Sequence, residues 1–232
     1  MYPKLKYPCT NESIEAVVAG LDLKKTDVVV SIGGSGDIPF AIAPHVGQVY
    51  AVDSSEVQTS FMAEQAGCMR ANDFVEFCGM WRVSEDALRE GALNYSPDEM
   101  GDVSVGNFVA RERYFSGDRF LSCRAAIDRV RVVNTDIIEF LKGRKRVNKL
   151  YLSNSLGWSR EPVSREDMGV IVSSIVLGGL AYETTYSGAN SHLGGSLRLI
   201  SHMRLTSKAE KIQLSENYGG HIWTPRVYRK VL

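Results

Sequence analysis

The chain has 232 residues, its 27 Lys and Arg are balanced by 27 Asp and Glu, and 44% of its residues are hydrophobic. This composition excludes a disordered or low-complexity chain and predicts one globular domain whose core needs no disulfide or metal. The zero net charge argues against nucleic-acid binding through a global positive field, and no apolar run approaches the roughly 18–20 residues that span a bilayer.

The cysteines and histidines form no metal-binding pattern. Cys9, Cys68, Cys78 and Cys123 include no C-x-x-C pair, and no His lies at a metal-ligand spacing from any of them. The four His are too scattered to supply an obvious base for a catalytic thiol. Residues 1–6 are not followed by the apolar stretch of a secretory signal. We therefore expect reduced thiols, no bound metal and a cytoplasmic protein without a membrane partner.

The first predicted element is a helix that begins near Asn11, a good N-cap residue. Glu12 and Glu15 then fall in the first turn, where the helix dipole favours acidic side chains. The apolar stripe of this helix consists of Ile14, Val17, Val18 and Leu21.

Residues 28–53 predict a strand, a glycine-rich turn, a short helix and a second strand. The β-branched run 28–32 is typical of a buried parallel strand, and it stops at the glycine-rich turn 33–36. A short helix over 38–43 and a strand over 49–52, which ends at Asp53, follow. This order implies a right-handed crossover in a doubly wound α/β sheet.

Residues 54–129 are too many for one crossover connection. We expect a helix over 56–67 and interpret residues 62–128 as a helical lid inserted into a single domain of residues 1–232. This segment is rich in aromatic and charged residues, and its Arg82 and Arg113 are candidates to bind a substrate carboxylate.

The second half of the chain predicts the rest of a sheet of about seven strands. Strands are expected over 130–136, 150–152, 180–186, 211–214 and 227–231, with Pro225 just outside the last, and helices over 137–141 and 168–176. A basic loop over 142–149 and a turn at Gly178 and Gly179 complete the pattern. The expected fold is therefore a Rossmann-like doubly wound sheet.

Polar and glycine residues lie where four of these strands end. In open α/β sheets the ligand binds outside the carboxyl ends of the strands. The residues at these ends are Gly33, Gly34, Ser35 and Gly36, then Asp53, then Thr135 and Asp136, and finally Ser153, Asn154 and Ser155. Asp53 lies nineteen residues after Gly34, a spacing at which an acid accepts the hydroxyls of a ribose. Together these residues predict an adenosine site.

The glycine turn favours S-adenosylmethionine over other adenosine compounds. No Lys follows the glycines, which excludes a phosphate loop of the G-x-x-x-x-G-K-[ST] type. Pro39 replaces the third glycine of the dinucleotide fingerprint, and proline resists the close helix packing needed there. Asp37 would lie near a pyrophosphate, whereas a carboxylate suits a ligand with ammonium and sulfonium groups. An NAD-linked reductase remains a distant alternative.

The segments "SIGGSGDIPFAIA", "AVDSSEVQTSFMAEQAG", "NTDIIEFL", "LYLSNSLGW" and "GGLAYETTYSG" resemble a known family. The first pair is similar to the first motif and ribose acid of class I S-adenosylmethionine-dependent transferases. The whole set most resembles the 3-amino-3-carboxypropyl transferases of betaine-lipid synthesis and the small azetidine-2-carboxylate synthases. The resemblance covers roughly residues 28–80 and 130–188. It implies cleavage of the Cγ–S bond and release of methylthioadenosine.

Site roles follow as hypotheses from this resemblance. The residues expected to bind S-adenosylmethionine are Gly33, Gly34, Ser35, Gly36 and Asp37 at the methionyl arm, Asp53, Ser54 and Gln58 at the ribose, Thr135, Asp136 and Ile137 at the adenine, and Ser153 and Ser155 nearby. The expected catalytic residues are Asn154, which orients the amine or carboxylate, and Tyr182 and Tyr186, whose rings face the sulfonium.

Three functions stay open on the sequence. The first is reaction at Cγ, either by ring closure to azetidine-2-carboxylate or by transfer to a small amine. The second is methyl transfer to a small molecule with release of S-adenosylhomocysteine, and the third is a non-catalytic module that binds an adenosyl ligand. In each case we expect a small-molecule ligand and no nucleic acid, and the oligomeric state stays open.

Overall fold

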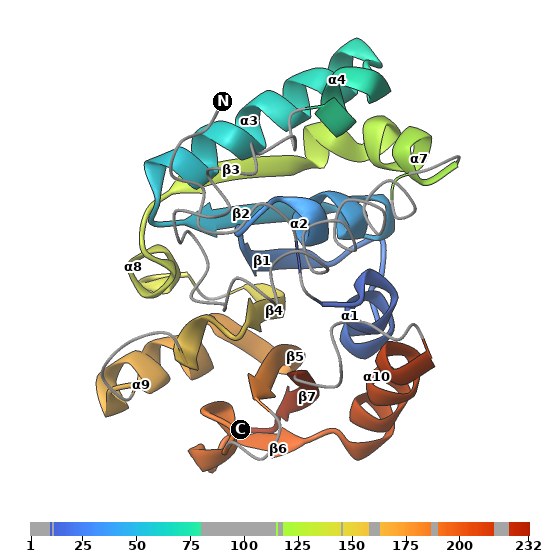
Figure 1. Ribbon diagram of the computed structural model, residues 1–232. Helices are drawn as coiled ribbons and strands as arrows, with labels where there is room; N and C mark the ends of the chain where they lie inside the picture. The colour runs from blue at the N-terminus through green and yellow to red at the C-terminus, as the bar shows by residue number, and fades with distance from the viewer. Residues whose placement is uncertain are drawn as a thin grey trace, which may run out of the picture.

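The fold is described from a computed structural model, which covers residues 10, 12–79, 115, 118–144, 146–157, 163–186, 190–215 and 223–232. Its centre is one seven-stranded sheet in the order β3-β2-β1-β4-β5-β7-β6 (Figure 1). The strands are β1 (Val28–Ile32), β2 (Gln48–Asp53), β3 (Val130–Asn134), β4 (Val147–Ser153), β5 (Ile175–Tyr186), β6 (Leu199–Ser201) and β7 (Trp223–Lys230). The prediction of a doubly wound α/β sheet of about seven strands is confirmed.

The first five strands run parallel, and β7 is reversed. β1 pairs in parallel with β2 on one side and β4 on the other, β2 pairs with β3, and β4 pairs with β5. β7 pairs antiparallel with both β5 and β6. The carboxyl ends of β1 to β5 therefore meet at one edge of the sheet, which we call the carboxyl edge.

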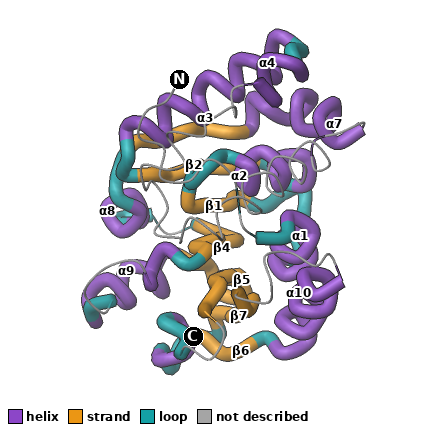
Figure 2. The backbone as a smooth tube through the Cα atoms, viewed as in Figure 1, coloured by secondary structure: helices purple, strands orange, loops and turns teal. Residues whose placement is uncertain are grey.

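Helices cover both faces of the sheet and enclose two apolar clusters (Figure 2). One face carries α1 (Ile14–Leu21), α2 (Asp37–Ile42), α3 (Glu56–Ala71), α4 (Phe74–Gly79), α7 (Asp118–Ala126) and α10 (Met203–Ser215). The other face carries α8 (Ile137–Leu141) and α9 (Arg165–Ser174). Burial on both faces explains why the strands read as continuous apolar runs rather than as alternating ones.

Helix α1 begins later than the sequence predicts. Its N-cap is Ser13, whose hydroxyl accepts the N–H of Ala16 at 3.0 Å. Glu12 therefore precedes the cap and does not belong to the first turn. The predicted stripe is confirmed, since Ile14, Val17 and Leu21 are buried.

Two predicted boundaries in the second half are wrong because strands extend into segments expected to be loops. β4 already begins at Val147, so Lys149 belongs to the sheet and is buried. The Nζ of Lys149 donates to the carbonyl of Asp22 at 3.0 Å and lies 3.8 Å from Asp27 Oδ2. Burial lowers the pKa of Lys149. β5 begins at Ile175 and runs through the predicted turn, since Gly178 takes a φ of +78° beside a shift in register with β4.

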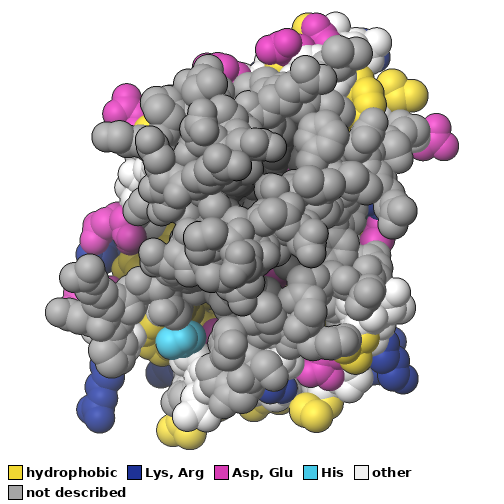
Figure 3. All heavy atoms as spheres, in the orientation of Figure 1, with side chains coloured by type: hydrophobic (Ala, Val, Ile, Leu, Met, Phe, Trp, Pro, Cys, Tyr) yellow, Lys and Arg dark blue, Asp and Glu magenta, His cyan; other side chains and the backbone are white. Residues whose placement is uncertain are grey.

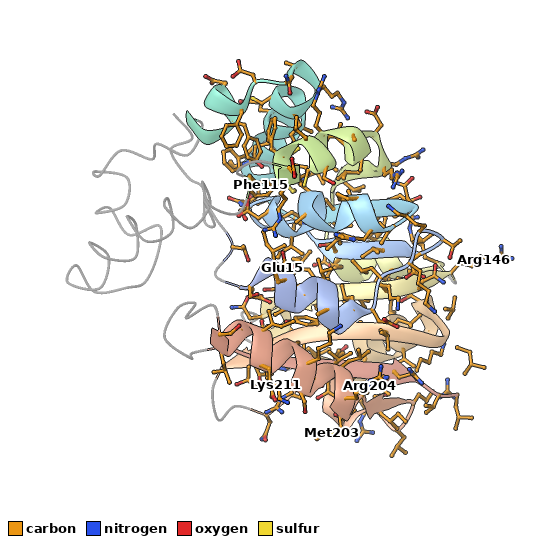
Figure 4. All side chains as sticks on the ribbon, turned by 90° about the vertical axis from the view of Figure 1, so that its right-hand side faces the viewer. Glu15, Phe115, Arg146, Met203, Arg204 and Lys211 are labelled. Carbon is orange, nitrogen blue, oxygen red and sulfur yellow. The ribbon has the colours of Figure 1, made fainter. Side chains whose placement is uncertain are left out.

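The strand predicted over 211–214 is wrong, because these residues form the end of α10; Lys211 is labelled on this helix in Figure 4. Leu205, Ala209 and Gln213 recur every four residues on its buried side, which is a helical period.

The sequence did not predict the three-residue strand β6. β7 is longer than predicted and includes Pro225, which pairs with Thr184 of β5 at a position that β6 does not reach.

The segment predicted as a lid is described only at its two ends. α3 runs continuously across the expected boundary at residue 62, with Met62 and Met69 buried against the sheet. The rings of Phe77, Phe115 and Phe120 then pack together, with centroids 5.1 Å apart for Phe77 and Phe115. Arg82, Arg113 and the rest of residues 80–114 lie outside the described residues. No described helix is long and apolar enough to cross a membrane.

Candidate functional site

The site is built at the carboxyl edge, where the order of the strands reverses. From β1 the chain continues to β2 on one side, and the later strand β4 lies on the other side. This arrangement leaves a switch point between the ends of β1 and β4, the usual ligand position in such sheets. Arg146, which precedes β4, marks the opposite end of the sheet, while Phe115 lies toward the carboxyl edge (Figure 4).

The glycine turn closes directly onto the end of β2. The N–H of Gly33 donates to the carbonyl of Val52 at 2.7 Å, and the N–H of Gly36 donates to the carbonyl of Gly33 at 2.9 Å. Gly34 and Gly36 have positive φ values of +51° and +88°. A Cβ on Gly34 would meet none of the described residues within 4 Å, whereas one on Gly36 would lie 2.7 Å from the Phe40 ring. No described side chain therefore fills the position beside Gly34.

Asp53 and Gln58 hold the turn from β2 and α3. Asp53 Oδ2 accepts the N–H of Gly34 and Oδ1 accepts the N–H of Ser55, each at 2.9 Å. Gln58 Nε2 donates to the carbonyl of Gly34 at 2.7 Å, so both backbone groups of Gly34 are fixed. The structure thus brings together three residues that the sequence assigned to one site, and Ser54 beside them is exposed.

Asp37 points into the protein rather than into open solvent. It is only 1% exposed, and its Oδ2 accepts the Ser35 hydroxyl at 2.9 Å and the N–H of Thr10 at 2.8 Å. The carboxylate therefore ties the segment before α1 to the glycine turn.

At the end of β3, one predicted residue lies beside Asp53 and two belong to the start of the helix that follows. The N–H of Thr135 donates to the carbonyl of Asp53 at 3.0 Å, which places it beside the acid. Asp136 is exposed and is the N-cap of α8, with Oδ1 accepting the N–H groups of Ile138 and Glu139 at 2.8 and 3.2 Å. Ile137 is buried in the apolar cluster under α8.

The end of β4 turns sharply. Ser153 has a φ of +53°, and its hydroxyl donates to Glu12 and lies 3.3 Å from Asn154 Oδ1. Asn154 is half-buried at this turn. The Ser155 hydroxyl donates to the carbonyl of Leu152 at 2.6 Å and so begins the short helix η3 (Ser155–Gly157). Ser153 and Asn154 are thus the polar groups at the β4 side of the switch point.

Glu12 is a buried acid that the sequence did not assign to the site. It is 1% exposed, and its Oε1 accepts the hydroxyls of Ser153 and Thr184, the latter at 3.0 Å. Burial raises the pKa of its carboxyl group despite these hydrogen bonds. The partners lie 141 and 172 positions away in the chain, so no local pattern could have revealed this contact.

Tyr182 packs beneath α1. Its side chain is fully buried, and its ring centroid lies 5.8 Å from that of Tyr151. A Cβ on Gly20 would come within 2.7 Å of the Tyr182 ring, so the glycine in α1 makes room for it. Burial raises the pKa of Tyr182 well above its ordinary value. The Tyr186 backbone pairs with Trp223, and its side chain lies outside the described residues.

The remaining ionisable groups form no further centre. In the described ranges no three His, Cys, Asp or Glu side chains gather as metal ligands. Cys123 is buried, which raises the pKa of its thiol to about 12 and makes it a poor nucleophile. On the face that looks onto the carboxyl edge, described acidic and basic side chains both lie around the rim (Figure 3).

Comparisons with known proteins identify the fold. No model of a known protein family matches the chain, and no curated protein matches it. A conserved hypothetical protein from Streptococcus pyogenes superposes with a TM-score of 0.52 at 10% identity, over 94% of this chain and 95% of that one.

Two further solved structures superpose with lower scores. An S-adenosylmethionine-dependent O-methyltransferase from Thermotoga maritima has a TM-score of 0.45 at 13% identity, over 94% of this chain and 64% of that one. An rRNA methylase from Streptococcus thermophilus has a TM-score of 0.42 at 11% identity, over 94% and 95%. At these identities the similarity concerns the fold alone. The strand order and the reversed β7 are those of a Rossmann-like doubly wound α/β fold, and the superposition on the Streptococcus pyogenes protein supports this fold.

Proposed function

We propose that this protein is an enzyme that acts on S-adenosylmethionine bound at the carboxyl edge, between the glycine turn and Asp53. The observation that carries the proposal is how the backbone of Gly34 is held and what surrounds it. Both of its backbone groups are held, by Asp53 and Gln58, while no residue of the described ranges other than its chain neighbours lies within 4 Å of the position of its absent Cβ. A ligand can therefore approach the backbone closely at a preformed turn.

The charges around the turn favour a cationic ligand over a diphosphate. Among the described residues the carboxylates of Asp37, Asp53 and Glu12 lie along this edge. The negative charges of a pyrophosphate would be repelled by these carboxylates. A sulfonium and an ammonium group are instead attracted by them, which supports S-adenosylmethionine over NAD.

The proposed roles follow the order of the strands. Asp53 accepts the ribose hydroxyls, and Thr135 lies next to it for the adenine end. Ser153 and Asn154, across the switch point at β4, contact the amino-acid arm. Tyr182 lies in the core under α1, so its contribution is to support the end of β5 rather than to offer a freely exposed ring.

The reaction that we propose opens the Cγ–S bond, by ring closure or by transfer of the aminocarboxypropyl group to a small amine, and releases methylthioadenosine. The resemblance of the strand ends to aminocarboxypropyl enzymes supports this choice. Incubation of the pure protein with S-adenosylmethionine alone separates the candidates. Methylthioadenosine with a cyclic imino acid indicates ring closure, and methylthioadenosine formed only with an added amine indicates transfer. S-adenosylhomocysteine indicates methyl transfer, and tight binding without turnover indicates a binding module.

Replacement of Asp53 tests the position of the ligand. We expect Asp53→Ala to weaken the binding of methylthioadenosine about ten- to a hundredfold, because hydrogen bonds to a charged group are lost and Gly34 is released. Titration calorimetry measures the change. Asp73→Ala is the control, since Asp73 likewise accepts a backbone N–H, from Glu76 at 2.8 Å, but lies at the start of α4. Equal affinity of the Asp53 variant and the native protein would contradict the proposed site.

A further inference from the structure

The segment before α1 crosses the carboxyl edge of the sheet. Its N–H at Thr10 donates to Asp37, just after β1. Two residues later, the side chain of Glu12 accepts the hydroxyls of Ser153 at the end of β4 and Thr184 near the end of β5. The Glu12 N–H donates to Thr10 Oγ1 at 3.1 Å, which links the two anchors directly. One segment therefore brings a carboxyl group to the β4–β5 side of the switch point.

This position is beyond the ribose end of the proposed ligand. Neighbouring strands lie about 4.8 Å apart, so the β4 and β5 ends are roughly 10–14 Å from β2 and Asp53 along the edge. With adenine and ribose at β3 and β2, the amino-acid arm must extend past the glycine turn toward β4. Glu12 places a carboxyl group there, whereas the side chain of Glu183 on β5 is directed to Ser191 and Leu193.

The surroundings of Glu12 leave it suited to bind a cation. Its Oε1 takes two hydroxyl donors, while its buried Oε2 has no hydrogen-bond partner among the described residues. No Lys or Arg of the described part pairs with it, and the ionisable groups beside it are the phenols of Tyr182 and of Tyr151, which also hydrogen-bonds to the Glu12 carboxyl group. A buried carboxylate without a paired cation is costly, so a ligand cation would stabilise it.

We propose that the Glu12 carboxylate binds the amino group of the S-adenosylmethionine arm and takes its proton, which makes an amine the nucleophile of this enzyme. This inference rests on the function proposed above. The burial that raises the Glu12 pKa also makes the carboxylate a better proton acceptor near neutral pH than an exposed one.

Atoms, electrons and charge are conserved in the proposed ring closure. Glu12 accepts one proton from the ammonium group and leaves a neutral amine. The nitrogen lone pair forms the bond to Cγ while the Cγ–S bond breaks, and its electron pair stays on sulfur. The sulfonium thus becomes the neutral thioether of methylthioadenosine, and the positive charge moves to the ring nitrogen, which keeps its two protons. Glu12 then releases its proton to solvent.

Two unreactive ligands test the contact without turnover. S-adenosylhomocysteine carries the same amino-acid arm but no sulfonium, and methylthioadenosine lacks the arm. We expect Glu12→Gln to weaken binding of S-adenosylhomocysteine about ten- to a hundredfold and to leave methylthioadenosine binding within threefold. The rate of methylthioadenosine formation from S-adenosylmethionine should fall about 10²–10⁴-fold, as for loss of a general base.

Glu183→Gln is the matched control. Glu183 is an equally buried acid on β5, but its side chain accepts Ser191 Oγ and the N–H of Leu193 at 3.4 Å on the side of the short helix η4 (Leu193–Gly195). This variant should bind both ligands like the native protein.

The outcomes separate the two proposals. If Glu12→Gln binds S-adenosylhomocysteine as tightly as the native protein, Glu12 does not contact the amino group. If it weakens both ligands equally, Glu12 only supports the pocket, which also overturns the inference. Failure of the native protein to bind either ligand would instead refute the proposed function itself.

Discussion

At the residue scale, two buried carboxyl groups set the expected pH dependence of stability. Glu12 and Glu183 are each 1% exposed, and burial raises the pKa of both above the ordinary value of 4.5. Their folded forms therefore hold protons more tightly than the unfolded chain does. The stability they contribute is present in full below pH 4.5 and is lost as the pH rises through their folded pKa values.

Replacing either acid by its amide should remove this loss of stability at neutral pH. We expect Glu12→Gln and Glu183→Gln each to raise the unfolding free energy at pH 7–8 by about 1 kcal/mol, or about 2–4 °C in melting temperature, with no gain near pH 4. Thermal melts from pH 4 to 8 measure the difference. If the Glu12 variant is more stable but binds the ligand less tightly, the Glu12 side chain serves function at the expense of stability. A uniform loss of stability at every pH would contradict the argument.

At the element scale, substitutions at the two positive-φ glycines of the turn should affect ligand binding and fold stability differently. Gly34 and Gly36 both have positive φ, but only at Gly36 would a Cβ collide, at 2.7 Å from Phe40 and 2.9 Å from Gln65. We expect Gly36→Ala to destabilise the fold by more than the roughly 1–2 kcal/mol of backbone strain alone. Gly34→Ala should cost only about that strain and yet weaken adenosyl-ligand binding at least tenfold. Urea denaturation and titration calorimetry of the two variants test this contrast, which equal stability losses would contradict.

Elements that are specified by a few consecutive residues were predictable from the sequence. Elements whose bounds depend on contacts with other elements were not. The run 28–32 and the helix over 137–141 match the structure because β-branched residues and an Asp136 cap act within a few residues. The start of β4 was missed because a charged Lys149 can enter a strand only when Asp27 and the Asp22 carbonyl lie beside it. Residues 211–214 were too few to distinguish a strand from a helix without the earlier turns of α10.

At the scale of the whole molecule, an aromatic cluster joins both ends of the long connection between β2 and β3 to the core. Phe115 is fully buried, and its ring packs edge-on against Phe77 of α4. We expect Phe115→Ala to lower the unfolding free energy by about 3–5 kcal/mol through the cavity it leaves. Leu121→Ala in α7 is the control, since Leu121 is 52% exposed and its loss should cost less than about 0.5 kcal/mol. Urea denaturation measures both, and equal effects would show that the cluster is not part of the core.

The sequence by itself determined the alternating α/β pattern and predicted that the glycine turn, Asp53 and Gln58 belong to one site, because these residues lie within about one crossover unit. The hydrogen bonds by which Asp53 and Gln58 hold Gly34 are seen only in the structure. Only the tertiary structure decided that β7 runs between β5 and β6, that Tyr182 lies under α1 and that Glu12 meets Ser153 and Thr184. These contacts join residues far apart in the chain. Their geometry depends on how whole elements pack, which no local propensity encodes.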